Sequence, residues 1–229
     1  MQIINEFIPV PTAKWCTCLH WNGQTAIPQA LFLAAEHALE LWVNGALFCR
    51  FTCTPAHLAE LCLGHLLLRG VIHAPSDLCS LHISADGRNA EATILQSGYR
   101  TPPASVIPEL SAALLQKAWS LFQTPDTLHV RTHGTHECSF ISASGEINLF
   151  EDISRSNAVR KAVGGAWLQG LCLQQGGLLL SARVTSEMVR DCAQAGIPVL
   201  IGKGVPSAAA ADLAEKEGIK LVVWGAKNI

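Results

Sequence analysis

Basic and small polar residues recur where four apolar segments of this sequence end. The clusters occupy residues 131–136, 151–157, 181–187 and 202–207. The last three clusters place Arg155, Arg183 and Lys203 at three consecutive element junctions, in a chain with only 15% charged residues. Guanidinium and ammonium groups beside the backbone N–H groups of helix starts bind phosphates well. The pattern therefore predicts a pocket for an anionic ligand at the strand ends of an α/β sheet.

Each cluster also has a purely structural interpretation. Asp152 or Ser154 can cap the helix that follows, and Thr185 and Ser207 can do the same for the next two helices. Capping and ligand binding both use small polar residues at helix starts. The sequence leaves both interpretations open for any one of these residues taken alone.

Histidine, cysteine and carboxylate side chains in these clusters raise three further possibilities. His133 and His136 could begin a metal site, but no residue at workable spacing completes the ligand shell, so we expect no structural metal. Cys138 could be a nucleophile beside His136 if both share a strand face; a buried strand cysteine is the alternative. Glu151 and Asp152 point to opposite faces of an extended chain, so we do not expect an acid–base pair.

The nine cysteines include no Cys-x-x-Cys pair. Their odd number, with an N-terminus that lacks a secretory signal, argues against a disulfide framework. Cys16 and Cys18 share one face if they lie on a strand. They could hold a metal there, or face the core as small apolar residues.

Length and composition limit the classes of protein to consider. The 229 residues fit one large domain or two small ones, and 49% hydrophobic residues can fill a sizeable core. A net charge of −2 excludes a globally basic nucleic-acid-binding protein. The longest apolar run, Leu58–Leu68, contains Glu60 and His65, so we expect no membrane span and a cytoplasmic location.

The first half of the chain predicts two hairpins and one main helix. Asn44-Gly45 is typical of a type I′ turn within a hairpin over residues 41–51, and Asp86-Gly87 predicts a second hairpin. Thr54-Pro55 is expected to open a helix, with Thr54 as N-cap, that Gly70 ends.

The second half predicts a regular alternation of elements. A linker at residues 97–105 divides an N-terminal α/β domain, residues 1–105, from a second domain, residues 106–229. The expected helices span 106–122, 155–169, 185–195 and 206–217, and the expected strands span 128–132, 138–143, 146–150, 177–181, 197–202 and 219–224. This order predicts an α/β (overall α+β) fold whose mixed sheet has helices on both faces.

The polar clusters also carry a family resemblance. The motifs that carry it are Thr132-His133-Gly134-Thr135-His136, then Glu151-Asp152-Ile153-Ser154-Arg155-Ser156-Asn157-Ala158, then Ser181-Ala182-Arg183-Val184-Thr185-Ser186-Glu187-Met188, then Ala195-Gly196-Ile197-Pro198 and Gly218-Ile219-Lys220-Leu221. In order and spacing the chain resembles the formate dehydrogenase accessory sulfurtransferase family, FdhD/NarQ, over nearly its whole length.

The resemblance implies a fold and a function. The second domain would be a cytidine deaminase-like three-layer α/β/α sandwich, in a cytoplasmic homodimer. Members of the family pass sulfur from a cysteine desulfurase to the molybdenum bis(pterin guanine dinucleotide) cofactor of apo-formate dehydrogenase. They carry the sulfur as a persulfide on a flexible Cys-x-x-Cys loop, and a guanine nucleotide can occupy their cofactor site.

Several positions depart from the family pattern. No cysteine lies between Cys79 and Cys138, where the Cys-x-x-Cys loop is expected. In the second motif this chain has Arg160 where the family usually has an aspartate. In the third motif it has Ala182 where the family usually has a glycine. From the resemblance we expect residues 224–228 to correspond to a shortened form of the family's aromatic-rich tail.

We therefore expect an accessory protein that binds the pterin guanine dinucleotide during maturation of a molybdenum or tungsten enzyme. The alternatives are a sulfurtransferase that uses another thiol, with Cys138 as candidate, and a chaperone of the apo-enzyme without chemistry of its own. Phosphate contacts are expected from the three cations, and a guanine or ribose contact from Glu151 or Asp152. The full expected site is Thr132, Gly134, His136, Glu151, Asp152, Arg155, Asn157, Ser181, Arg183, Lys203, Trp224 and Lys227.

Overall fold

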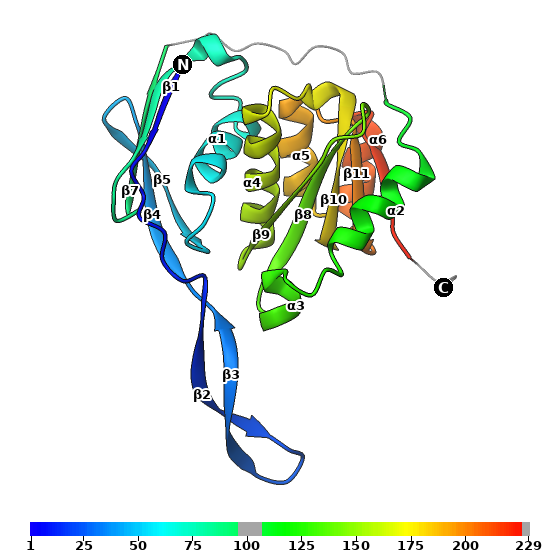
Figure 1. The fold of residues 1–229 in the computed structure, drawn as a ribbon. Helices are drawn as coiled ribbons and strands as arrows, with labels where there is room; N and C mark the ends of the chain where they lie inside the picture. Colours follow the sequence, from blue (N-terminus) through cyan, green and yellow to red (C-terminus); the bar gives the residue numbers. More distant parts are fainter. Residues whose placement is uncertain (96–106, 226–229) are drawn as a thin grey trace.

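The structure, a computed structural model, describes residues 1–95 and 107–225. Two five-stranded sheets lie on either side of a layer of helices, and a two-stranded ribbon projects away from both (Figure 1). We call residues 1–95 the first lobe and residues 107–225 the second lobe. This mixture of sheets and helices confirms the predicted α+β class.

The sheet of the first lobe has the strand order β1-β6-β7-β4-β5. Its strands are β1 (Gln2–Asn5), β4 (His37–Val43), β5 (Ala46–Cys53), β6 (Leu78–Ile83) and β7 (Asn89–Ile94). Both expected hairpins are confirmed, because β4 pairs with β5 and β6 with β7 in antiparallel register. Asn44 and Gly45 have φ values of 49° and 79°, as a type I′ turn requires.

Helix α1 (Leu58–Leu68) begins later than predicted. Its N-cap is His57, which has a left-handed φ of 56° and makes no side-chain cap bond. The expected cap, Thr54, instead donates from its backbone N and its Oγ1 to Asp152 Oδ2, at 3.0 and 3.2 Å. The prediction was wrong because a contact with the other lobe uses the polar groups that the local pattern assigns to a cap.

The sheet of the second lobe has the order β12-β11-β10-β8-β9. Its strands are β8 (His136–Ser142), β9 (Ile147–Asp152), β10 (Gly176–Arg183), β11 (Val199–Gly204) and β12 (Lys220–Val223). The last three run parallel, whereas β8 is antiparallel to both β9 and β10. The predicted mixed sheet is confirmed.

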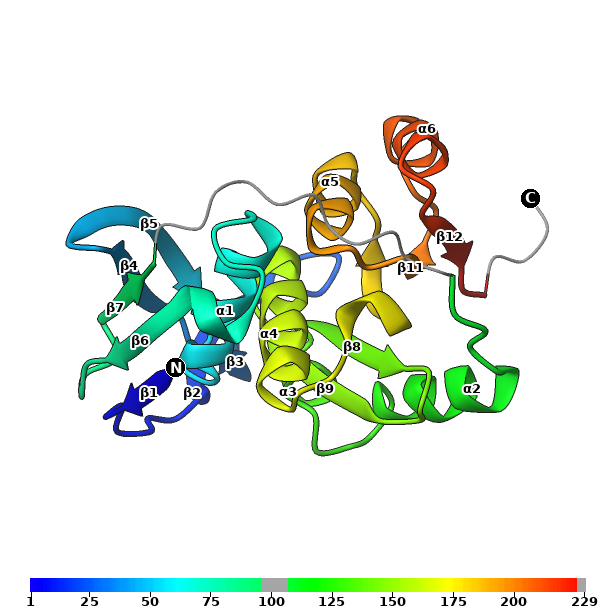
Figure 2. The same ribbon diagram turned by 90° about the horizontal axis from the view of Figure 1, so that it is seen from above.

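Helices cover both faces of this second sheet (Figure 2). On one face lie α4 (Arg155–Leu168), α5 (Ser186–Ala195) and α6 (Ala208–Lys216), and on the other lies α2 (Ala112–Leu121). The arrangement is the expected α/β/α sandwich.

Two segments of the second lobe differ from the prediction. Residues 128–132, expected as a strand, form the short helix α3 (Leu128–Thr132), whose N-cap Thr127 accepts a hydrogen bond from Val130 N at 3.2 Å. The helix expected from residue 106 begins only at Ala112, after the N-cap Ser111. In both cases a side-chain cap, which defines the helix start, outweighs the local apolar pattern.

The projecting ribbon consists of β2 (Ala13–Trp21) and β3 (Ala26–Ala34), which pair with each other along their whole length. Its side chains are largely exposed; Trp15 is 71% and Trp21 64% exposed. Cys16 and Cys18 do lie on a strand, but they sit half-buried on this ribbon. The alternative in which Cys16 and Cys18 face the core is therefore wrong.

A single large apolar core is shared by the two lobes. Within this core, α1 of the first lobe packs against α4 of the second lobe, with Gly64 and Gly164 facing each other. A Cβ atom added to Gly64 would overlap the carbonyl oxygen of Arg160, and one added to Gly164 would overlap that of Glu60. Glycine at both positions lets the two helix backbones touch.

The predicted division after residue 105 falls outside the residues that the structure describes, so the domain boundary stays a prediction. None of the helices in the described ranges is long and apolar enough to cross a membrane.

Candidate functional site

The strand directions bring the predicted polar clusters to one edge of the second sheet. β8 begins there with His136, which pairs with Asp152 at the end of β9. β10 ends there with Arg183, which pairs with Gly204 at the end of β11. Helices α4 and α5 start at the same edge, so clusters that are far apart in the sequence meet in space.

Three unpaired cations occupy this edge. Arg155, Arg183 and Lys203 are all exposed. Within residues 1–95 and 107–225, none of them forms an ion pair with a carboxylate. Their positive field adds to that of the α4 and α5 N-termini, where free N–H groups favour anions.

Two tryptophans stack beside one of these cations. The rings of Trp119 and Trp224 are 5.2 Å apart with an interplanar angle of 26°, and Lys203 Nζ lies 5.5 Å from the centre of the Trp119 ring. Sequence reasoning proposed Trp224 and Lys203 but missed Trp119, which comes from α2 near the start of the second lobe. The expected Lys227 lies outside the described residues.

The carboxylate of Glu151 caps helix α3. It accepts hydrogen bonds from the backbone N atoms of Leu128 and His129, at 2.8 and 2.6 Å. At the other end of α3, Thr132 Oγ1 donates to Leu128 O and accepts from Gly134 N, at 2.7 and 3.1 Å. Glu151, Thr132 and Gly134 therefore shape the α3 loop beside the cation edge.

Asp152 and Asn157 face the protein interior. Asp152 is 0% exposed, and its Oδ2 lies 2.6 Å from Lys161 Nζ. Its Oδ1 accepts from Ser154 N and Asn157 Nδ2, at 2.9 and 3.3 Å. Asn157 also donates to Thr52 O in the first lobe, at 2.9 Å. The expectation that Asp152 contacts a ligand is corrected, because its carboxylate is fully enclosed in the junction between the lobes.

A buried glutamate that the sequence analysis did not propose lies next to the site. Glu137 is 2% exposed, its backbone N donates to Ser181 Oγ at 2.9 Å, and its Oε1 has no hydrogen-bond partner among the described residues. Burial, then the charge of Glu151, raises its pKa to about 8. The available sequence signal was one charged residue at the start of an apolar strand.

His136 stands half-buried at the start of β8. Burial, then the charges of His129 and Arg155, lowers its pKa below the ordinary value. The imidazole is therefore neutral at physiological pH, when it can both donate and accept a hydrogen bond.

The candidate thiol, Cys138, is 0% exposed inside β8, and burial raises its pKa well above the ordinary value. A thiol in this state cannot meet a partner protein or form a thiolate readily. The exposed thiols of the described residues are Cys79 and Cys172. The structure thus argues against Cys138 as a catalytic residue.

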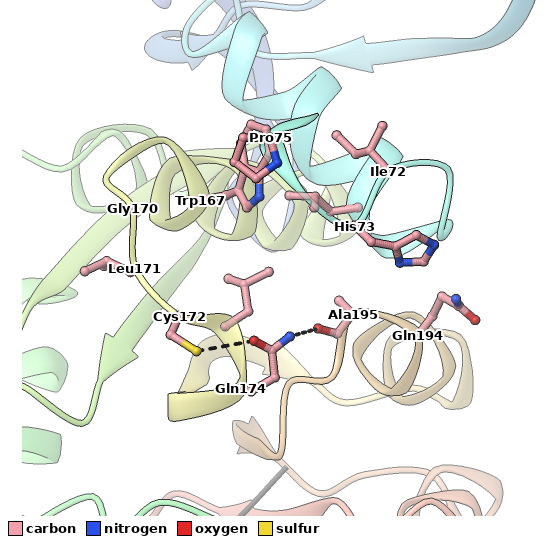
Figure 3. Close-up of a pocket in the computed structure, with 12 residues that line it drawn as sticks. Ile72, His73, Pro75, Trp167, Gly170, Leu171, Cys172, Gln174, Gln194 and Ala195 are labelled. Atoms are coloured by element: carbon pink, nitrogen blue, oxygen red, sulfur yellow. Dashed lines mark hydrogen bonds between the residues drawn. The ribbon is translucent and has the colours of Figure 1, made fainter. Parts of the chain in front are cut away.

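Two cavities of about 260 Å³ each lie at opposite ends of the lobe junction. One adjoins the α3 loop and is lined by residues that include Thr54, Arg131 and Glu151. The other lies at the C-terminal end of α4, where Gln174 accepts from Cys172 Sγ at 3.3 Å and donates to Ala195 O at 3.1 Å (Figure 3). Neither cavity is lined by Arg155, Arg183 or Lys203, but the first adjoins the α3 loop that lies beside the cation edge.

Comparisons with known proteins agree on one family. A sequence profile of the FdhD/NarQ family matches residues 34–106 and 95–227. The chain is 29% identical to the sulfur carrier protein FdhD of Bordetella parapertussis, covering 86% of this chain and 83% of that protein. It is 31% identical to the sulfur carrier protein FdhD of Streptomyces avermitilis, with 83% and 82% covered.

A solved structure shares the fold. The crystal structure of a protein assigned as a formate dehydrogenase accessory protein, from Desulfotalea psychrophila, superposes with a TM-score of 0.77 over 93% of both chains, at 22% identity. At that identity the likeness supports the architecture alone.

Proposed function

This chain belongs to the FdhD/NarQ family, and on that premise we propose that it is an accessory protein in the maturation of a formate dehydrogenase-type molybdenum or tungsten enzyme. Its role would be to hold the pterin guanine dinucleotide cofactor at the cation edge of the second lobe. The observation that carries the proposal is the convergence of three exposed, unpaired cations from three separate elements on one edge.

The residues present fit a dinucleotide with phosphate groups and flat rings. Arg155, Arg183 and Lys203 would hold phosphate oxygens, with arginine able to offer two parallel N–H groups. The stacked Trp119 and Trp224 would offer an aromatic face to a planar ring. When bound, the dinucleotide would supply the metal-carrying pterin that the client enzyme lacks.

Sulfur transfer is the second candidate function, because the relatives named above are sulfur carrier proteins. It needs an exposed thiol that forms a thiolate. Cys138 at the cation edge is enclosed, so a sulfur step would use a thiol elsewhere, with Cys79 and Cys172 the exposed ones among the described residues. We therefore propose cofactor binding as the primary role.

Partners follow from the same proposal. We expect a homodimer that works in the cytoplasm with an apo-formate dehydrogenase-type enzyme. A cysteine desulfurase would join them if sulfur is carried.

Calorimetry with GDP tests cofactor binding. Arg183→Ala should weaken binding by about 1.5–3 kcal/mol if the guanidinium holds a phosphate. Arg190→Ala is the matched control, because Arg190 is exposed on the same helix-bearing face but lies inside α5, away from its N-terminus. Folded wild-type protein that binds neither GDP nor the cofactor would refute the proposal.

Persulfide labelling tests the second function. The protein is incubated anaerobically with a cysteine desulfurase and radiolabelled cysteine, and labelled peptides are identified. Label on Cys79 or Cys172 would establish sulfur carriage by a thiol outside the cation edge. Label on Cys138 would contradict the inference from its burial, and absence of label would leave the cofactor-binding role alone.

A further inference from the structure

A second basic cluster lies away from the cation edge, on the side where β5 meets α1, α4 and α5. It contains Arg160 of α4, His65 and Arg69 of α1, and the half-buried thiol of Cys49 on β5. The family resemblance gives it no role, since the usual residue at the position of Arg160 is an aspartate. Its geometry has features that point to a ligand.

Arg160 has an unused hydrogen-bonding edge. Its Nη1 donates to Asn157 Oδ1 at 2.7 Å, but its Nε is buried and has no partner among the described residues. Within residues 1–95 and 107–225, no carboxylate comes within ion-pair distance of this guanidinium. An unpaired buried guanidinium N–H is costly, and a ligand oxygen would satisfy it.

His65 supplies a second unpartnered nitrogen. The residue is 7% exposed, its ring stands edge-on to Phe51 with centroids 5.1 Å apart, and its Nδ1 has no hydrogen-bond partner in the described ranges. Phe51 also lies under the guanidinium of Arg160, which is 5.8 Å from the ring centre. The two unsatisfied groups thus flank the same aromatic ring.

Charge in the cluster is predominantly positive around the thiol. Burial raises the pKa of Cys49 to about 11, while the charges of Arg160 and Arg69 act to lower it. Arg69 is itself paired with Glu187 and Asp191, at 3.0 and 3.1 Å. These two carboxylates also face Arg160 at longer range, so Arg160 carries the larger unneutralised charge.

We propose that Arg160, flanked by His65 and Arg69, binds a carboxylate or phosphate group next to the thiol of Cys49. The free Nε edge of Arg160 would take one oxygen and His65 Nδ1–H another, with Arg69 adding attraction at longer range. This site is independent of the proposed cofactor role, because it uses other residues, although α4 carries both Arg160 and Arg155.

Competitive alkylation of the intact protein tests the site. Iodoacetate carries a carboxylate and iodoacetamide does not, yet both react with the same thiolate. The pKa of the thiol therefore affects both rates equally and drops out of their ratio. Peptide mass spectrometry gives this ratio for Cys49 and, as an internal control, for Cys172, whose thiol is hydrogen-bonded to an uncharged amide. We expect the ratio at Cys49 to exceed that at Cys172 about fivefold, which corresponds to about 1 kcal/mol of attraction.

Two further measurements separate the site from a general charge effect. Arg160→Gln should bring the Cys49 ratio down to that of Cys172, whereas Arg160→Lys should retain part of it. In the wild type, inorganic phosphate should slow iodoacetate at Cys49 more than chloride does at equal ionic strength, a test that needs no variant to fold. Equal ratios at both cysteines, or a Cys49 ratio that phosphate and Arg160→Gln leave unchanged, would overturn the proposal.

Discussion

Lys161 places a fully buried ammonium group at the junction of the lobes. Its Nζ lies 2.6 Å from Asp152 Oδ2 and 2.7 Å from Thr54 Oγ1, and both charged side chains are 0% exposed. Removing one member of such a pair leaves an uncompensated buried charge, which costs about 3–5 kcal/mol. Lys161→Met should lower the free energy of unfolding by about that amount in a urea titration.

The paired replacement provides the control for this prediction. Lys161→Met combined with Asp152→Leu removes both charges, so it should recover part of the stability that the single substitution loses. A single variant as stable as the wild type would show that Asp152 finds another partner or is not charged in the folded protein.

Glu137 should make the stability depend on pH. Its pKa rises from 4.5 to about 8 on folding, so between these values the unfolded chain has lost a proton that the folded protein keeps. The free energy of unfolding should therefore fall as the pH rises through this window and level off above it. Each pKa unit corresponds to about 1.4 kcal/mol, so the total is several kcal/mol at most.

Glu137→Gln should flatten this dependence and make the variant more stable than the wild type near pH 8. Urea titrations at a series of pH values measure the effect. Glu217→Gln is the control, because Glu217 is exposed at the end of α6. A Glu137→Gln profile parallel to that of the wild type would contradict the raised pKa.

The sequence predicted the cations of the site better than its carboxylates. Arg155, Arg183 and Lys203 lie at or shortly after the ends of predicted strands, so the strand directions bring them to one edge. The role of Asp152 depends on Lys161 and Thr54, which reach it from another helix and from the other lobe. A contact of that kind leaves no local pattern, and its discovery required the structure.

At the scale of elements, the close approach of α1 and α4 holds the lobes together. Gly64→Ala or Gly164→Ala would place a methyl group against the backbone carbonyl of the facing helix, which cannot move without separating the helices. Overpacking of this kind costs about 1–3 kcal/mol or more. We expect either substitution to lower the unfolding midpoint measured by circular dichroism.

Gly165→Ala provides the comparison within the same helix. The added methyl group would meet ring carbons of Phe150, a side chain that can turn, rather than backbone. Its loss of stability should therefore be smaller than that of Gly164→Ala. An equal or larger loss would mean that the spacing of the two backbones does not set the tolerance at this interface.

Elements whose signals are local were predicted well, and those set by long-range capping were not. The Asn44-Gly45 turn and the helix end at Gly196, with φ of 71°, follow from residues at the site itself. Helix α3 was mistaken for a strand because its five residues are too short to show a helical period. Its start is stabilised by Glu151, which lies outside the segment.

At the scale of the molecule, the lobe junction relates the two proposed sites. Helix α4 begins at the cation edge with Arg155, carries Lys161 and Gly164 into the junction, and presents Arg160 to the second basic cluster. One helix thus supports the cation edge, the contact between lobes and the proposed anion site. Substitutions in α4 should be judged by folding measurements before any binding assay.

The ribbon of β2 and β3 contributes no buried residue to the apolar core that the two lobes share. Its ends already meet, because Ala35 N donates to Thr12 O at 2.7 Å, and the contact of Arg131 with Phe32, at 4.9 Å, lies near its base. An isolated two-stranded hairpin is marginally stable in water. Replacing residues 16–31 by an Asn-Gly turn keeps the base and the pairing of Trp15 with Phe32.

We expect this shortened protein to unfold cooperatively within a few degrees of the wild type, and limited proteolysis of the wild type to cut first inside the ribbon. Circular dichroism melts and mass spectrometry of the fragments measure the two effects. Loss of cooperative unfolding in the shortened protein would mean that the exposed Leu19 and Trp21, which it lacks, stabilise the fold through contacts made beyond the single chain. A ribbon that resists protease while loops elsewhere are cut would lead to the same conclusion, because two strands paired only with each other cannot protect themselves.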